Sequence, residues 1–302
     1  MKSFNWAVLN YKKINKSIFH NSKYLMVLFS FLISFLSVAE VKWQHDQEII
    51  ANLPYSTTLD YAHFGFSVAK YGDYVLVGSP GDRGRLRSSF GEGHGRAYLY
   101  KQAHDGWEEI ATFTPNTDRV INFGLEVAIS ENTIAIAAPN YDDGYGSWNQ
   151  NSRDPKIFIY EKSGSEWSSS QPVAIITEDY WDWGRFGSSM SLSNDTLVVG
   201  SAHFSLSFDD RSRGAVYVYE KPDDGWSMLK GRSARLTPEK WTNNLKFGSS
   251  VKLQGDTIVV AADRTPNVYL FEKQGDSWRD MTETELFNVT SDIADKEDYQ
   301  VD

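Results

Sequence analysis

A Phe-Gly pair recurs four times at nearly even spacing along this chain of 302 residues. The pairs begin at positions 64, 123, 186 and 247, so they lie 59, 63 and 61 residues apart. Each pair is followed by two apolar segments joined by a short turn, an aromatic third segment and a tryptophan. A period of this length predicts one supersecondary unit repeated in tandem, whose copies stack to bury a continuous core.

Within each unit the residue pattern predicts four short antiparallel strands. The second segments, such as Val75-Leu76-Val77, are apolar at consecutive positions, which is typical of a strand buried on both faces. Third segments such as Tyr98-Leu99-Tyr100 suit packed strand surfaces. Turns such as Gly72-Asp73 suit tight hairpins. The fourth strands are predicted to begin at the recurrent Trp107, Trp167, Trp226 and Trp278. The chain is therefore expected to be all-β, a β-propeller of four-stranded antiparallel blades with about four complete repeats.

These units resemble FG-GAP repeats, the blades of the integrin α-subunit propeller. The resemblance rests on the Phe-Gly pair and on the apolar strand after it, which ends in Gly78-Ser79-Pro80 or a variant of that motif, and it covers about residues 43–287. Integrin-type repeats often hold a calcium loop between these strands, whereas this chain has only tight turns there. Calcium takes six to eight oxygen ligands, so the chain resembles the branch of the family without the calcium loop. Neither a metal nor another cofactor is expected.

The N-terminal region predicts export. Residues 1–23 carry five lysines and no acidic residue, and the apolar run 24–38 ends in small residues. Residues 1–39 are therefore interpreted as a signal peptide, with an N-terminal membrane anchor as the alternative. The repeats are expected over 40–287, in units starting near Phe64, Phe123, Phe186 and Phe247, and residues 288–302 are expected to be an acidic C-terminal tail or the start of a missing blade. The expected localisation is secreted or at the cell surface, or the periplasm in a bacterium.

Charge and cysteine content narrow the possible partners. Without residues 1–39 the chain has 25 basic and 40 acidic residues, a net charge of −15. Such a surface repels nucleic acid and anionic lipid, so neither is an expected partner. The absence of cysteine excludes disulfides and thiolate metal sites.

Strand alternation predicts that the long loops gather at one end of the blades. The 1–2 and 3–4 turns share one end, while the 2–3 connections (81–95, 140–155, 203–213) and the 4–1 connections (116–122, 178–185, 239–246) share the other. Loops on a rigid scaffold often carry function, and Tyr, Trp and Arg are enriched at binding hot spots. The alternative is that these rings fold back over the blades. The candidate ligand-binding residues are Phe90, Tyr145, Trp148, Arg153, Trp181, Trp183, Phe204, Phe208 and Trp241.

The sequence favours binding over catalysis. No H-E-x-x-H spacing or G-x-S-x-G motif occurs, so we expect no enzyme. The expected function is a secreted or cell-surface adhesion module that recognises an extracellular protein through the long loops. A carbohydrate-binding propeller with a glycan partner and a structural segment of a larger surface protein are the alternatives. The loops differ between units, which favours one composite protein-binding surface over repeated sugar pockets.

Counting strands leaves two architectures open. Residues 43–54 resemble a fourth strand, yet the last unit has its own from Trp278 to about Phe287. Five fourth strands for four units indicate an incomplete propeller, whose open blade edges permit self-association. The competing interpretation is a closed ring of four blades with residues 278–302 as an acidic tail.

Overall fold

The computed structural model divides the chain into two compact units, Met1–Glu48 and Ile49–Asp302, and all of the described residues belong to the second. Within it the structure describes residues 49, 62–81, 95–115, 120–139, 155–167, 169, 171–178, 185–193, 195–204, 212–238, 244–263, 265–273, 275–276 and 278, and the backbone of 283–288. The predicted signal segment 1–39 and residues 289–302 lie outside this set. Within the described ranges, no helix has the length and apolar character needed to cross a membrane.

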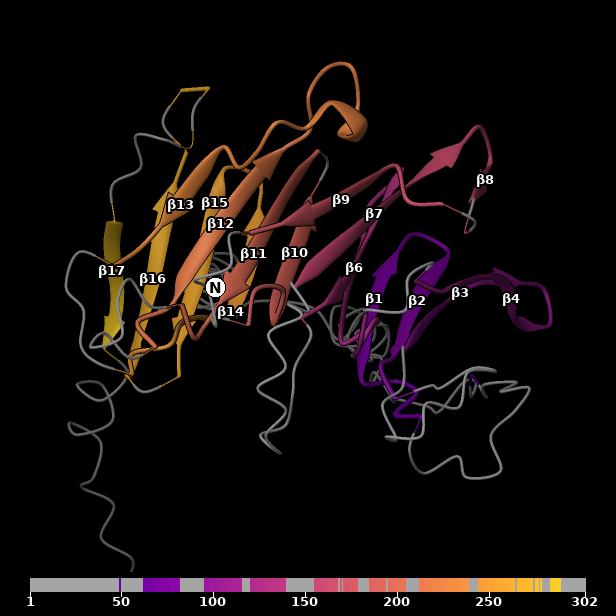
Figure 1. Cartoon of the computed structure of the whole chain (residues 1–302), viewed down its shortest axis with the longest axis horizontal. Helices are drawn as coiled ribbons and strands as arrows, with labels where there is room; N and C mark the ends of the chain where they lie inside the picture. Colours follow the sequence, from indigo (N-terminus) through magenta and orange to yellow (C-terminus); the bar gives the residue numbers. More distant parts are fainter. Residues whose placement is uncertain are drawn as a thin grey trace, which may run out of the picture. The chain divides into compact units, whose positions relative to one another are not determined.

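Four antiparallel sheets, each built from strands consecutive in sequence, make up the described residues (Figure 1). The first sheet comprises β1 (Ser67–Tyr71), β2 (Tyr74–Ser79), β3 (Arg96–Ala103) and β4 (Gly106–Phe113). The second comprises β5 (Glu126–Ile129), β6 (Thr133–Ala138), β7 (Lys156–Ser163), β8 (Glu166–Trp167) and β9 (Ala174–Thr177). The third comprises β10 (Ser189–Ser193), β11 (Thr196–Ser201), β12 (Ala215–Glu220) and β13 (Ala234–Leu236). The fourth comprises β14 (Phe247–Gln254), β15 (Thr257–Ala262), β16 (Asn267–Glu272) and β17 (Glu283–Asn288).

This topology confirms the predicted all-β architecture of propeller-type blades. Neighbouring strands pair in chain order, except that β9 pairs with β7. β17 pairs with β16, so residues 283–288 form a strand of the fourth sheet. The interpretation of 278–302 as a tail alone is therefore wrong for this stretch. Each of the four sheets therefore has its own fourth strand, as the count of fourth strands in the four units predicted.

The predicted start of the fourth strand needs correction in the third and fourth sheets. In the first and second sheets β4 and β8 begin beside Trp107 and Trp167, whereas in the third sheet Trp226 lies in the 3₁₀ helix η2 (Trp226–Met228), well before β13. Trp167, Trp226 and Trp278 are buried, so they hold packing positions. Because β13 and β17 start late, the connections 221–233 and 273–282 are long. The end expected to carry only short turns therefore carries these two long connections as well.

Consecutive sheets pack face to face through apolar side chains. One core cluster joins the first sheet to the second, another the second to the third, and another the third to the fourth. The central strands of the second and third sheets therefore meet a different neighbour on each face, which explains their continuous apolar sequences. The first cluster includes Leu76 and Ile136, the second Ala135 and Val199, and the third Val198 and Val260.

The Phe-Gly pair forms a tight turn at the entrance to the first strand of each sheet. In the second sheet the carbonyl of Asn122 accepts a hydrogen bond of 3.0 Å from the N–H of Leu125. Gly124 has φ 86°, as the third position of a type II turn requires. The Phe123 ring is fully buried, with its centroid 5.1 Å from that of Phe158. Phenylalanine anchors the turn, and glycine permits its backbone conformation.

This turn is also the point where adjacent sheets come closest. A Cβ atom on Gly124 would lie 2.2 Å from the carbonyl oxygen of Arg96 in the first sheet. The carbonyl of Gly124 accepts a hydrogen bond of 3.1 Å from the Ser67 hydroxyl, and Ser189 donates in the same way to Gly248 at 2.8 Å. The turn therefore fixes the junction between sheets as well as the start of a strand.

We predict that Gly124→Ala lowers the free energy of unfolding by more than about 3 kcal/mol, because it combines positive-φ strain with the clash against Arg96. Gly65→Ala is the matched control, since Gly65 has φ 85° but a Cβ atom there would have no neighbour within 4 Å. Its expected cost is only about 1–2 kcal/mol from backbone strain. Urea unfolding followed by tryptophan fluorescence compares the two, and equal losses would refute the proposed clash.

Candidate binding face

The 2–3 connection of one sheet meets the 4–1 connection of the next. Gly95 forms a bridge with Phe123, and Gly214 forms one with Phe247. The carbonyl of Arg213 also accepts a hydrogen bond of 2.9 Å from the N–H of Phe247. These contacts confirm that the two kinds of connection share one end. We call it the loop end; its described part comprises the Phe-Gly turns and residues next to the 2–3 connections.

Of the nine candidate ligand-binding residues, the structure describes only Phe204. The other eight, Phe90, Tyr145, Trp148, Arg153, Trp181, Trp183, Phe208 and Trp241, lie outside the described residues. Phe204 is 8% exposed; its ring centroid lies 6.4 Å from that of Tyr217, and the Arg235 guanidinium lies 5.3 Å from the ring. The expectation of an exposed ring at Phe204 is wrong. The residue follows β11 so closely that its ring folds back onto the core.

A polar cluster lies at the loop end where the third and fourth sheets meet. Nδ1 of His203 lies 3.2 Å from the Ser212 hydroxyl oxygen, and the Lys246 ammonium donates to Asp263 at 2.8 Å. Burial and the positive charges of Arg185 and Lys246 lower the pKa of His203 to about 4, while Asp263 opposes the shift. The imidazole is therefore neutral at physiological pH.

This cluster suits polar recognition better than catalysis. A histidine activates a serine best when its pKa lies near the working pH and a carboxylate orients it. The pKa of His203 is too low for that role, and the carboxylate of Asp263 is bound by Lys246. Among the described residues, no group of three or more His, Cys, Asp or Glu side chains is arranged to hold a metal ion.

The structure also reveals a series of strained residues that the sequence analysis missed. The residue before each Phe-Gly pair has a positive φ: His63 54°, Asn122 57°, Arg185 56° and Lys246 54°. A non-glycine residue in this region costs about 1 kcal/mol, so the surrounding hydrogen bonds must hold it there. Aligning the four units at Phe-Gly would have shown that this position is polar in every one. The series places four different polar side chains at equivalent sites of the loop end.

The innermost strands β1, β5, β10 and β14 line a shared cavity of about 580 Å³. Its wall includes Glu126, which replaces the serine found at the equivalent positions 67, 189 and 250. Burial raises the pKa of the Glu126 carboxyl to about 7, although the backbone of Met190 hydrogen-bonds to it and lowers the pKa in part. This difference is visible in the sequence, because the second unit reads Phe-Gly-Leu-Glu where the other three units read Phe-Gly-x-Ser.

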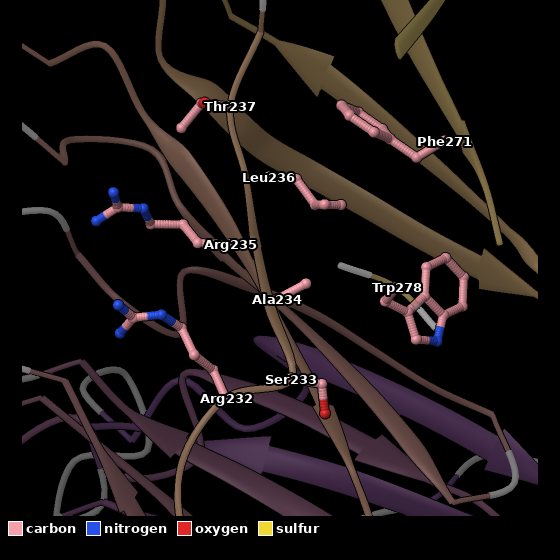
Figure 2. A pocket seen from close by; sticks show the side chains of 8 residues that line it. All are labelled: Arg232, Ser233, Ala234, Arg235, Leu236, Thr237, Phe271 and Trp278. Carbon is pink, nitrogen blue, oxygen red and sulfur yellow. The ribbon is translucent and has the colours of Figure 1, made fainter. Parts of the chain in front are cut away.

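A groove of about 500 Å³ lies between the edge strand β13 and the fourth sheet (Figure 2). Its lining includes Leu236, Phe271 and the buried Trp278, while the side chains of Arg232 and Arg235 point to the opposite side of β13. Arg232 pairs with Glu178 at 2.6 Å, and Arg235 covers the ring of Phe204. Arg232 is thus engaged by a residue next to β9 of the second sheet, and Arg235 by a ring of the third sheet.

The fold and junctions define a protein of tandem propeller-type blades, and the comparisons agree. The family model of the FG-GAP repeat matches residues 43–100 and 170–219. Over these two ranges the match confirms the resemblance to FG-GAP repeats. No curated protein matches the sequence. FG-GAP repeats are typical of integrin-like extracellular binding modules, and the repeat is a non-enzymatic binding or structural unit.

We predict that Glu126→Gln stabilises the protein above pH 7. The native carboxyl titrates near pH 7 whereas an unfolded one titrates near 4.5, so wild-type stability falls as pH rises through this window. One pKa unit corresponds to about 1.4 kcal/mol; we expect the variant to gain about 1–2 kcal/mol at pH 8 and little at pH 4, since the site is partly solvated. Thermal melts from pH 4 to 8 measure this. The exposed Glu131→Gln is the control, and the same pH response in both variants would contradict the assignment.

Proposed function

We propose that the chain is a secreted or surface-displayed, non-enzymatic adhesion module that binds an extracellular protein through its loop end. The observation that carries the proposal is the hydrogen-bonded seam between the 2–3 and 4–1 connections. Because Lys246 and Phe247 donate backbone hydrogen bonds to Ser212 and Arg213, the bases of loops from adjacent sheets are fixed relative to each other. Fixed loop bases reduce the entropy lost on binding. Loops from two sheets can then form one composite surface.

The composition of the loops supports a protein partner. The connections 140–155 and 178–185 contain Tyr145, Trp148, Trp181 and Trp183, the residue types enriched at interface hot spots. At the junction of the third and fourth sheets, Arg185, Lys246 and Asp263 add charged groups of both signs. A mixture of aromatic anchors and charges is typical of protein interfaces.

A carbohydrate ligand is the second candidate, because aromatic rings and carboxylates also suit sugar faces and hydroxyls. It is favoured by the aromatic and acidic sequence Glu178-Asp179-Tyr180-Trp181-Asp182-Trp183. The connections differ in sequence between units, however, so equivalent sugar pockets in every blade are not expected.

The purified chain can be tested against arrays of extracellular protein domains and of glycans. We predict that the Trp148→Ser, Trp181→Ser double variant loses at least about tenfold in affinity for a bound protein domain, because each ring is expected to be a hot spot. Met228→Ser is the control, since this side chain is 52% exposed on the connection 221–233 at the opposite end. Binding to glycans alone would favour the carbohydrate alternative. Equal losses in the double variant and the control would exclude the loop end as the binding surface.

A further inference from the structure

A lysine from each following sheet reaches back to the sheet before it. At the second junction the ammonium of Lys221 lies 2.8 Å from Glu161, and at the third that of Lys273 lies 2.7 Å from Glu220. At the first junction, the ammonium of Lys162 lies 4.8 Å from the centroid of the Tyr74 ring. These lysines occupy equivalent positions, directly after the third strand's acidic residue. The junction therefore has a repeated cationic contact that runs in one direction along the chain.

Tryptophans of the following sheet repeat this pattern in two junctions. Trp167 packs edge-on against Tyr74 with ring centroids 6.2 Å apart, and the indole N–H of Trp226 donates to the Thr133 hydroxyl at 3.3 Å. Tyr74 and Thr133 are both the first residue of a second strand. We call the face of a sheet that contacts the following sheet its trailing face. At these junctions the trailing face contributes a serine, the first residue of the second strand and an acidic residue. The next blade contributes a Phe-Gly carbonyl, a tryptophan and a lysine.

The outer face of the fourth sheet presents the same trailing pattern. Glu272 stands at the position of Glu161 and Glu220, Thr257 at that of Thr133, and Ser250 at that of Ser67 and Ser189. Ser67 and Ser189 are buried, but Ser250 and Glu272 are exposed, and Glu272 has no ion pair among the described residues. Among the described residues, the polar half of a junction is therefore present without its partner.

The apolar half of this face is also only partly covered. Leu270 and Val259 are half-buried, whereas the residues equivalent to Leu270 in the first three sheets (Leu99, Ile159 and Val218) are each 0% exposed. Val268 and Ala261 are half-buried as well. Four apolar side chains in the centre, with a serine, a threonine and a glutamate around them, match the composition of the buried trailing face of the third sheet.

The first sheet is a poor partner for this face, whether from the same chain or from a second copy. Its residue at the lysine position is Gln102, which cannot form the ion pair with Glu272. The inner strands would also bring two lysines together. At the third junction, Ser191 accepts a hydrogen bond of 3.0 Å from the N–H of Leu253. In a contact between the fourth and first sheets, Lys252 would take the position of Ser191 and Lys70 that of Leu253. Like charges in such a contact are destabilising.

We propose that the outer face of the fourth sheet binds an FG-GAP blade of a partner polypeptide, one that carries lysine at the position of Lys273. The blade supplies a Phe-Gly carbonyl for Ser250, an indole for Thr257 and an ammonium for Glu272, and it buries Val259 and Leu270. The interface repeats the junctions within the chain, so its geometry is already established there. This inference is independent of the loop end and of the proposed adhesion function.

A duplicated blade tests the proposal in the full chain. A copy of residues 237–288 is inserted between Asn288 and Val289, so that the second Lys273 can reach the original Glu272. We expect the melting temperature to rise by about 5–10 °C, because an added repeat contributes an interface to a stacked array. Lys273→Glu in the inserted copy should remove part of this rise, and Glu272→Lys in the original blade should restore it. An unchanged melting temperature, or no effect of the charge reversal, would overturn the proposal.

The absence of cysteine allows the position of the inserted blade to be mapped. In a Leu270→Cys variant, we expect a thiol reagent to react at least about tenfold more slowly once the blade is inserted, because the side chain becomes buried. Val68→Cys is the control, since Val68 is 61% exposed on the first sheet and should react equally in both proteins. Protection of Val68→Cys instead, or no protection of Leu270→Cys, would show that the face does not accept the blade.

Light scattering of the unmodified chain tests whether a second copy of the chain binds the outer face of the fourth sheet instead. We expect a monomer, because the like charges of Lys70 and Lys252 and the missing lysine at Gln102 oppose head-to-tail contact. An oligomer that Leu270→Glu converts to monomer would overturn the proposal and make a second copy the occupant.

Discussion

The arrangement of the described sheets depends on one backbone conformation, the positive φ of the glycine in each Phe-Gly turn. That glycine lets the chain turn into a new strand while its neighbour's ring enters the core. Its missing side chain leaves room for the preceding sheet, whose backbone lies where a Cβ atom would be at Gly124 and Gly248. The conformation of this one glycine therefore also permits a close contact between two sheets. The positive φ of this glycine occurs in all four units, which explains why the pair recurs while the loops between the pairs differ.

Around this fixed turn, the junctions tolerate chemical variation. Two junctions use a serine hydroxyl to satisfy the glycine carbonyl, whereas the second sheet places Glu126 there and pairs it with the backbone of Met190. The exchange has an electrostatic cost, visible in the raised pKa of the carboxyl, because burial disfavours its charged form. The ion pairs of Lys221 and Lys273 lie near the surface, where such pairs contribute little to stability but help to set the register of neighbouring sheets.

The features that depend on short-range pattern could be predicted from the sequence. Consecutive apolar residues at 75–77 and 134–136, with tight turns before them, indicated the strands, and the Phe-Gly spacing indicated the repeat. Prediction failed where tertiary contacts decide. Trp226 was expected to open a strand but donates a hydrogen bond to Thr133 of the preceding sheet, and Phe204 was expected on the surface but packs on Tyr217. The burial of Glu126 and the strained residues before each Phe-Gly pair depend on neighbours from other units, which no single segment specifies.

The direction of the junction contacts also affects how copies of the protein behave when crowded. In a symmetric pair of trailing faces that matches rim with rim, the two Glu272 side chains share one edge and the two Lys252 side chains the other, so this orientation is repelled at both edges. The apolar centre formed by Val259 and Leu270 is thus flanked by charges that oppose the same face of a second copy in this orientation. An exposed apolar face is a liability for aggregation, and here the flanking charges oppose this orientation of two identical chains.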